Sequence, residues 1–471
     1  MNPLDLSPEE FRHLAERAVQ EAGEYLAGLD SRPTFPSTSG GQTTKIFSSQ
    51  LPEQGMGARA FDAVAEIFAH SRPGNGRFFG YVFGSGEPVG AVADLVAGVL
   101  NQNVTAWRSA PAAVSIERTV IGWLGEALGC AGFSGSLCGG GSSANLMALA
   151  MAREAKAPAN QRGTQPGVVY ASEEVHMSVP KALALLGLGY GSLRTIATDE
   201  RYRIKFDALS EAMEADARAG KRIVAVVGSA GTVNTGSIDP LAEMAELAQR
   251  HGAWFHVDGA YGALAALAVP EKFKGMERAD SISLDPHKWL YQPVDCGCLL
   301  YRDPAAAQAA FAHSGDYTKV LSKDPIEGFA FFEESMELSR RFRALKVWLS
   351  LRYHGLEAFR RAIGRDLEHG QRLARRVAAT PELEVLAPVE LSAVCFRYTR
   401  GDDLNGLNAA ILRRVIERGR VYLSNTTLRG KFALRACFVN HRTVESDVDA
   451  IIEEVLAAAG EVRASQKTHA S

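Results

Sequence analysis

The chain has 471 residues, of which 46% are hydrophobic and 22% charged, with a formal net charge of −3. This composition is typical of globular proteins, and the length predicts a large domain with at least one smaller domain. The charge balance excludes the basic surface of a nucleic-acid-binding protein.

The cysteines argue against a metal site. None of the six forms a C-x-x-C motif, and the one close pair, Cys296 and Cys298, lies in a strand-like run. Buried reduced thiols are the favoured interpretation, and they are typical of the cytoplasm. The chain contains no run of about 18 apolar residues, and its N-terminal residues do not show the basic and then apolar pattern of a signal peptide. We therefore expect a soluble cytoplasmic protein without a membrane span.

The first expected element is a helix that begins at Ser7, with proline and glutamate in its first turn. Apolar residues recur at helical spacing from Phe11 to Leu26, which predicts a face that docks against another domain or subunit. Residues 31–58 are rich in Pro, Gly, Ser and Thr and should form an irregular wrapping segment. We assign residues 1–84 to this N-terminal part.

Helix-like and strand-like segments alternate through residues 85–364, the expected large domain. The expected strands are residues 167–172, 222–229, 253–258 and 281–285, and the expected helices include 111–128, 142–155 and 241–252. This alternation predicts an α/β fold with a mostly parallel sheet covered on both faces. Ligands of such sheets bind beyond the carboxyl ends of the strands.

Residues 365–471 show a different pattern. The expected elements are a helix at 404–419, a hairpin within 421–439 and a last helix at 443–460, followed by a disordered tail. This order predicts a small C-terminal α+β domain.

Residues suited to bind a cofactor follow several expected strands. Gly139–Gly141, with Ser142 and Ser143, precede a helix and could hold a phosphate, although such a turn is as often a plain connection. Asp258 ends one buried run and either caps the next segment or pairs with a cation. Lys288 trails another run beside aromatic residues, where desolvation favours a nucleophilic amine. His176 follows a third.

Pyridoxal phosphate needs each of these groups. It requires a phosphate site, an acid beside its pyridine nitrogen, a lysine for its aldehyde and a flat group over its ring. The sequence supplies one candidate for each, and together they predict a pyridoxal-phosphate enzyme.

At residues 8–458 the chain resembles the group II pyridoxal-phosphate decarboxylases, most of all the aromatic-amino-acid branch. The stretches that carry the resemblance are HVDGAYGA, SLDPHKWL, SRRFRALKVW and LRGKFALRACFVNHRTVES. The resemblance implies fold-type I, as in aspartate aminotransferase, and a homodimer with active sites at the interface, contacted by residues 1–84. It also implies a carboxy-lyase that converts an L-amino acid, expected to be tyrosine, dopa or histidine, to the amine and CO2.

The resemblance also implies residue roles. Lys288 becomes the Schiff-base lysine, Asp258 the partner of the pyridine nitrogen, and His176 the group that stacks on the ring. Further cofactor contacts are implied for Ala260, Gly141, Ser142, Thr232 and His287. Tyr317, in a charged loop at residues 312–335, matches the tyrosine that returns a proton to Cα.

Substrate contacts are implied less sharply. Arg341 lies in the family's arginine-bearing segment, but the sequence leaves open whether it or Arg340 faces the site. Tyr81, Phe83, Asn103 and Ser339 are the other expected substrate contacts. The serine favours a phenolic or imidazole amino acid over tryptophan. Asp285 departs from the asparagine of many animal members, and its charge is unexplained unless it caps the turn.

Three alternatives remain open. The polar Asn103 and Thr105 also suit a decarboxylase of glutamate-like or diamino acids, for which Arg77 or Arg108 would face a distal carboxylate. An aldehyde-forming decarboxylase-deaminase would share the cofactor. A non-catalytic scaffold is disfavoured because Lys288, Asp258, His176 and Tyr317 are all present.

Overall fold

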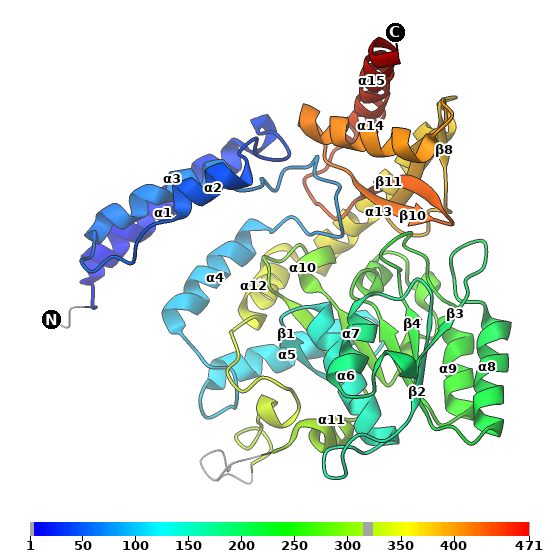
Figure 1. Cartoon of the computed structure of the whole chain (residues 1–471). Coiled ribbons are helices and arrows are strands. Elements are labelled where there is room, and N and C mark those ends of the chain that lie inside the picture. The colour runs from blue at the N-terminus through cyan, green and yellow to red at the C-terminus, as the bar shows by residue number, and fades with distance from the viewer. Residues whose placement is uncertain (1–3, 314–323, 471) are drawn as a thin grey trace.

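The computed structural model describes residues 4–313 and 324–470, and its N-terminal arm projects away from the rest of the chain (Figure 1). The arm consists of α1 (Pro8–Ala27), α2 (Gly40–Phe47) and α3 (Ala63–His70). The expected helix start is confirmed, because Ser7 and Glu10 form a capping box. The expectation of an irregular segment over residues 31–58 was wrong at α2, which a second capping box between Ser39 and Gln42 stabilises.

A seven-stranded sheet forms the centre of the large domain. Its order is β1-β7-β6-β5-β4-β2-β3, and only β7 runs antiparallel to its neighbours. The strands are β1 (Ser134–Cys138), β2 (Val168–Ser172), β3 (Leu193–Ile196), β4 (Ile223–Ser229), β5 (Trp254–Asp258), β6 (Ser281–Leu284) and β7 (Gly297–Tyr301). The four expected strands are confirmed, and the fold is the fold-type I α/β architecture that the sequence predicts.

Helices cover both faces of this sheet, as alternate side chains of one strand show. Val169 and Ala171 of β2 pack in the cluster of α6 (Gly141–Lys156) and α7 (Ser178–Leu185), whereas Val168 and Tyr170 pack in the opposite cluster. The opposite face carries α5 (Pro111–Ala127), α8 (Phe206–Arg218) and α9 (Leu241–Arg250). The remaining helices of this domain are α4 (Pro88–Leu100), α10 (Pro286–Trp289), α11 (Pro304–Phe311) and α12 (Ala344–His354).

A second, antiparallel sheet of order β10-β11-β9-β8 forms the small domain. It comprises β8 (Leu383–Val385), β9 (Ala393–Tyr398), β10 (Ser424–Leu428) and β11 (Lys431–Cys437), covered by α13 (Leu356–Ala378), α14 (Leu404–Arg418) and α15 (Glu445–Ala470). α13 crosses the boundary expected between residues 364 and 365. α15 continues to Ala470, so the expectation of a disordered tail was wrong for the described residues.

All six cysteines are buried and unpaired, as the sequence indicates. Burial raises the pKa of the Cys130 thiol to about 11 and that of Cys138 to about 12, which keeps both protonated. Within residues 4–313 and 324–470, no helix is long and apolar enough to span a membrane.

Candidate active site

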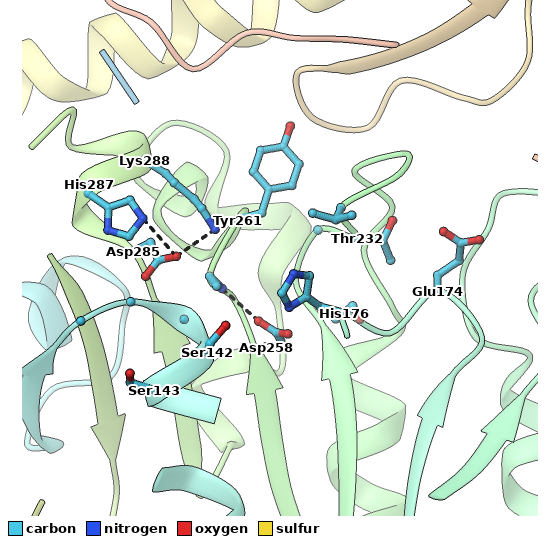
Figure 2. A pocket seen from close by; sticks show the side chains of 17 residues that line it. Ser142, Ser143, Glu174, His176, Thr232, Asp258, Tyr261, Asp285, His287 and Lys288 are labelled. Carbon is cyan, nitrogen blue, oxygen red and sulfur yellow. Dashed lines mark hydrogen bonds and ion pairs between the residues drawn. The ribbon is translucent and has the colours of Figure 1, made fainter. Parts of the chain in front are cut away.

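A cavity of about 250 Å³ lies at the carboxyl edge of the large sheet, where β1, β2, β4, β5 and β6 end (Figure 2). Eight sequence-predicted site residues line it: Gly141, Ser142, His176, Thr232, Asp258, Ala260, His287 and Lys288. Parallel strands place the residues that follow them at one edge, which is why segments far apart in sequence meet here.

The turn between β1 and α6 forms one wall of the cavity. Gly140 has φ +143°, a conformation that L side chains rarely adopt. A Cβ on Gly141 would lie 2.5 Å from Ala260 Cβ and 3.2 Å from Asp285 Oδ2, so only glycine fits. The 16-residue α6 begins at this wall, and the Gly140 N-cap provides no side-chain hydrogen bond for the first amides of the helix. This wall therefore suits a phosphate group.

Asp258 ends β5 and is buried between β4 and β6. Its Oδ1 accepts hydrogen bonds from Ser283 Oγ (3.1 Å) and the Ala260 amide (3.3 Å). Its Oδ2 accepts one from Asn145 Nδ2 at 2.9 Å. These three donors fix the position of the carboxylate, which can face a cationic partner in the cavity. That property fits a protonated pyridine nitrogen.

Lys288 lies on α10, directly after β6, and points into the cavity. Its Nζ lies 2.8 Å from Asp285 Oδ2, and His287 Nε2 lies 3.5 Å from the same oxygen (Figure 2). Asp285 is the N-cap residue of α10, but its side chain makes no capping hydrogen bond. Capping is therefore not its role. Instead, Asp285 is the counter-ion of the Lys288 ammonium, and burial lowers the pKa of His287.

His176 and Thr232 lie on the opposite wall, after β2 and β4. His176 Nδ1 lies 2.8 Å from Ser178 Oγ, and burial lowers the pKa of the imidazole. Thr232 Oγ1 is buried 3.0 Å from Thr235 Oγ1. A flat neutral ring and fixed hydroxyls here complete a site with the donor set that pyridoxal phosphate needs.

The decisive comparison is with a family model described as "Pyridoxal-dependent decarboxylase conserved domain", which matches residues 66–399. The chain belongs to this family. Its cofactor is pyridoxal phosphate, and it is a lyase that decarboxylates an amino acid. The glycine turn, Asp258 and Lys288 fit that cofactor.

Similar proteins cover nearly the whole chain. An aromatic-L-amino-acid decarboxylase of Bacillus atrophaeus is 36% identical over 98% of both chains. A phenylacetaldehyde synthase of Petunia hybrida is 28% identical over 91% of this chain and 90% of its own. The crystal structure of Oryza sativa TDC with PLP and tryptamine has a TM-score of 0.90 at 27% identity, covering 98% of this chain and 99% of that one.

Other sequence-predicted residues of this decarboxylase do not line the cavity. Tyr81, Phe83, Asn103 and Ser339 are exposed, and Asn103 Oδ1 accepts a hydrogen bond from the Arg340 amide at 2.9 Å. Tyr317 lies outside the described residues. Substrate contacts by these residues remain predictions.

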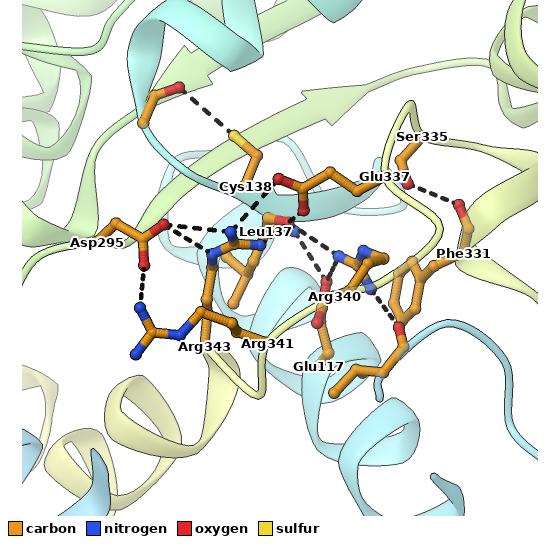
Figure 3. A network of polar contacts seen from close by, with 12 residues as sticks. Glu117, Leu137, Cys138, Asp295, Phe331, Ser335, Glu337, Arg340, Arg341 and Arg343 are labelled. Atoms are coloured by element: carbon orange, nitrogen blue, oxygen red, sulfur yellow. Dashed lines mark hydrogen bonds and ion pairs between the residues drawn. The ribbon is translucent and has the colours of Figure 1, made fainter. Parts of the chain in front are cut away.

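The two arginines at 340 and 341 point in different directions, and neither lines the cavity (Figure 3). Arg340 is buried beside β1, where it pairs with Glu117 and donates to the Leu137 carbonyl at 2.9 Å. The Arg341 side chain is 64% exposed and lies 3.2 Å from Asp295. Arg340 is thus the inward residue, but it stabilises the large domain. The substrate contact expected of Arg341 remains a prediction.

Sequence reasoning missed a buried guanidinium beside the cavity, Arg435. It donates to the carbonyls of Val233 (2.5 Å), Tyr81 (2.9 Å) and Asn234 (2.9 Å), and Val233 lines the cavity. Among the described residues no carboxylate forms an ion pair with it. A charged residue within the apolar run of β11 was the signal that could have identified it.

Proposed function

We propose that this enzyme decarboxylates an aromatic L-amino acid, with Lys288 carrying the cofactor. The observation that supports this most is the convergence of the glycine turn, Asp258 and Lys288 on one cavity. The aromatic class is supported by the 36% identity with an aromatic-L-amino-acid decarboxylase along the full chain. Within that class, Ser339 favours phenolic or imidazole side chains over indole.

Different residues of the chain would bind the phosphate, the pyridine nitrogen and the ring of the cofactor. The α6 amides, Gly141 and Ser142 would hold the phosphate, and Asp258 would keep a proton on the pyridine nitrogen. When bound, pyridoxal phosphate supplies an electron sink for the pair released as CO2 leaves. His176 and Ala260 would enclose the ring. In that position they would exclude water from the reacting carbon.

Arg435 is the proposed partner of the substrate carboxylate. A buried guanidinium that has only neutral acceptors is stabilised by any anion that reaches it. Its carbonyl partner Val233 lines the cavity, so the charge lies beside the substrate space. Tyr317, which the resemblance assigns as proton donor, would deliver its phenolic proton to the substrate Cα.

The cavity wall disfavours an acidic substrate. The Glu174 carboxylate lines it, held by a 2.9 Å hydrogen bond from Asn234 Nδ2. Arg77 and Arg108, which an acidic substrate would need, are not among the lining residues; Arg77 instead donates to the Asp30 carbonyl at 2.8 Å. Like charges repel, so a side-chain carboxylate would be bound poorly.

A homodimer and a cytoplasmic location are also part of the proposal. α1, α2 and α3 contain no buried residue, and Phe11, Val19, Phe47 and Ile67 are exposed along this arm. α4 exposes Val92, Val96 and Val99 as well. So large an apolar surface indicates an interface, for which a second copy is the proposed partner. The six reduced cysteines support a reducing compartment.

Borohydride trapping followed by peptide mapping tests the proposed role of Lys288. We expect the reduced adduct at Lys288, its loss in Lys288→Ala, and no change in Lys181→Ala, which removes an exposed lysine of α7. An adduct at another position would overturn the assignment.

A panel of tyrosine, dopa, histidine, tryptophan and glutamate, assayed for CO2 and amine together, tests the substrate. Turnover of glutamate above all the aromatic acids would reject the aromatic class.

Aldehyde formation is the second candidate, favoured by the likeness to a phenylacetaldehyde synthase. It consumes oxygen and releases peroxide, whereas decarboxylation alone yields amine and CO2 in equal amounts. Oxygen uptake measured with the same panel separates the two reactions. We expect none above the rate of Lys288→Ala.

A further inference from the structure

A chain of buried polar side chains lies behind the cavity and connects two of its walls. Asn145 of α6, Ser178 of α7 and His256 of β5 are each at most 3% exposed, and none of them lines the cavity. Asn145 and Ser178 link Asp258 to His176, and His256 contacts Asn145. Hydrogen-bond geometry fixes the direction of each bond in this chain.

The carboxylate of Asp258 orients Asn145. An ionised carboxylate only accepts, so the Asn145 atom 2.9 Å from Asp258 Oδ2 must be the amide nitrogen Nδ2. The second Nδ2 hydrogen then points to Ser178 Oγ at 2.8 Å. The Asn145 Oδ1 is left to accept from His256 Nε2, also at 2.9 Å.

His256 supports this orientation from the other side. Burial lowers the pKa of His256 to about 4, so the ring is neutral at physiological pH. With its proton on Nε2, its bare Nδ1 accepts from Ser281 Oγ at 2.9 Å. Ser281 Oγ in turn accepts from Trp254 Nε1 at 2.8 Å, and indole nitrogen can only donate. His256 Nδ1 also lies 3.2 Å from the Ser281 carbonyl oxygen, which cannot donate, so in this tautomer only the contact with Ser281 Oγ is a hydrogen bond.

The other half ends at His176. Ser178 Oγ accepts from Asn145, so its own hydrogen is free for His176 Nδ1 at 2.8 Å. The Ser178 amide also points at His176 Nδ1, at 3.3 Å. Two donors converge on Nδ1, which must therefore carry a lone pair. The proton of the neutral ring resides on Nε2.

We propose that Asn145 and Ser178 are positioning residues that hold His176 neutral, with its proton on Nε2, and couple its state to the carboxylate of Asp258. This inference rests on the proposed roles of His176 and Asp258 at the cofactor. It means that His176 offers the cavity a flat face and a donor, and that Nδ1 is not available as a base.

Charged groups on several elements face His176 with opposite effects. Asp258 of β5 and Asp285 before α10 favour the imidazolium, whereas Lys288 of α10 and Lys181 of α7 disfavour it. Burial is the largest cause of the lowered pKa of His176, and the two donors on Nδ1 act in the same direction, because protonation of that nitrogen would break both bonds.

Histidine-selective ¹⁵N NMR of the holoenzyme tests the proposal. We expect an unprotonated Nδ1 and a protonated Nε2 for His176, assigned by its loss in His176→Gln. Ser178→Ala should raise the pH midpoint of this histidine by about one unit, and Ser178→Thr, which keeps the hydroxyl, should restore it. The control is Ser136→Ala on β1, because Ser136 Oγ is equally buried and has no hydrogen-bond partner among the described residues.

Asn145→Leu tests the coupling. It removes a donor from Asp258 and from Ser178 at once, so it should shift both the His176 midpoint and the pH midpoint of the cofactor's visible absorption band. Ser178→Ala should shift the first alone. A protonated Nδ1 in the unmodified enzyme, or equal midpoints in Ser178→Ala and Ser136→Ala, would overturn the proposal. Histidine NMR and borohydride trapping are independent measurements. Absence of an adduct at Lys288 would contradict the proposed function, whereas the NMR result decides the proposed state of His176.

Discussion

One oxygen of the Asp285 carboxylate contacts two basic residues, Lys288 and His287, and the other oxygen accepts no hydrogen bond from the described residues. Its Oδ2 lies 2.8 Å from Lys288 Nζ, while Oδ1 is buried without a hydrogen-bond partner among the described residues. The same carboxylate lies against the glycine turn, 3.2 Å from where a Cβ of Gly141 would be. An anion here holds the Lys288 side chain in an ion pair and repels a phosphate.

We therefore expect Asp285→Asn to bind the cofactor faster. The neutral amide releases Lys288 Nζ from its ion pair and removes the repulsion of the phosphate, so the rate of appearance of the visible cofactor band at neutral pH should rise about tenfold, equivalent to about 1.4 kcal/mol. The control is Asp94→Asn, which disrupts another lysine–aspartate pair, with Lys346 at 3.0 Å, away from the cavity. Equal or slower binding in Asp285→Asn would show that the charge assists the cofactor instead.

The role of a single residue was predictable from sequence where its position relative to a buried strand was sufficient to place it at the cavity. Asp258 ends one buried strand and Lys288 follows another, and that placement brings them to one edge. Partners were not predictable in this way. Asn145 meets Asp258 across 113 positions, and Arg435 meets Val233 across 202. No local pattern encodes such contacts, because they depend on how helices and domains pack on the sheet.

Among the elements, the turn before α6 is the most sharply constrained. Gly141→Ala would place a Cβ 2.5 Å from Ala260 Cβ, so either the turn or the segment after β5 must shift. We expect the dissociation constant for the cofactor, measured by fluorescence titration, to rise at least about tenfold.

A second glycine provides the control for this expectation. Gly122 lies inside α5, and a Cβ added there would meet no atom within 4 Å. Gly122→Ala should therefore leave cofactor affinity unchanged and stabilise the helix by about 0.5–1 kcal/mol. If both variants bind the cofactor equally well, the close approach at Gly141 does not shape the site.

Elements were predictable in proportion to their apolar content. β2, β4 and β5 are buried at every position and were visible as continuous apolar runs. β1 (SGSLC) and β3 (LRTI) were missed because they are short and partly polar. α2 was missed although Ser39 and Gln42 carry the capping-box pattern, since the glycines of its first turn suggested a loop.

At the scale of the whole molecule, one buried carboxyl joins the cofactor region to the small domain. Asp366 of α13 accepts hydrogen bonds on Oδ2 from Tyr291 Oη (2.8 Å), which lies three residues after Lys288, and from the Asn440 amide (3.0 Å) after β11. Burial raises the pKa of Asp366 to about 7. Ionisation of this carboxyl therefore opposes folding within the physiological range.

The sign of the pH dependence follows from proton binding. Between its ordinary pKa of 3.8 and about 7, the folded protein holds this proton and the unfolded chain does not, so the free energy of unfolding falls as pH rises through that window. The contribution of Asp366 is fully present below pH 3.8 and lost above about pH 7, a change of at most about 4 kcal/mol.

Asp366→Asn should flatten this dependence. An amide oxygen at the Oδ2 position still accepts from Tyr291 and Asn440, and no proton is exchanged. In urea unfolding of the holoenzyme at pH 5 and pH 8, we expect the variant to lose less stability between the two values than the unmodified enzyme does. Asp402→Asn, at an exposed carboxyl of the same domain, is the control and should behave as the unmodified enzyme. Parallel pH profiles for all three proteins would show that Asp366 is ionised throughout, and that the domains are joined without a titrating group.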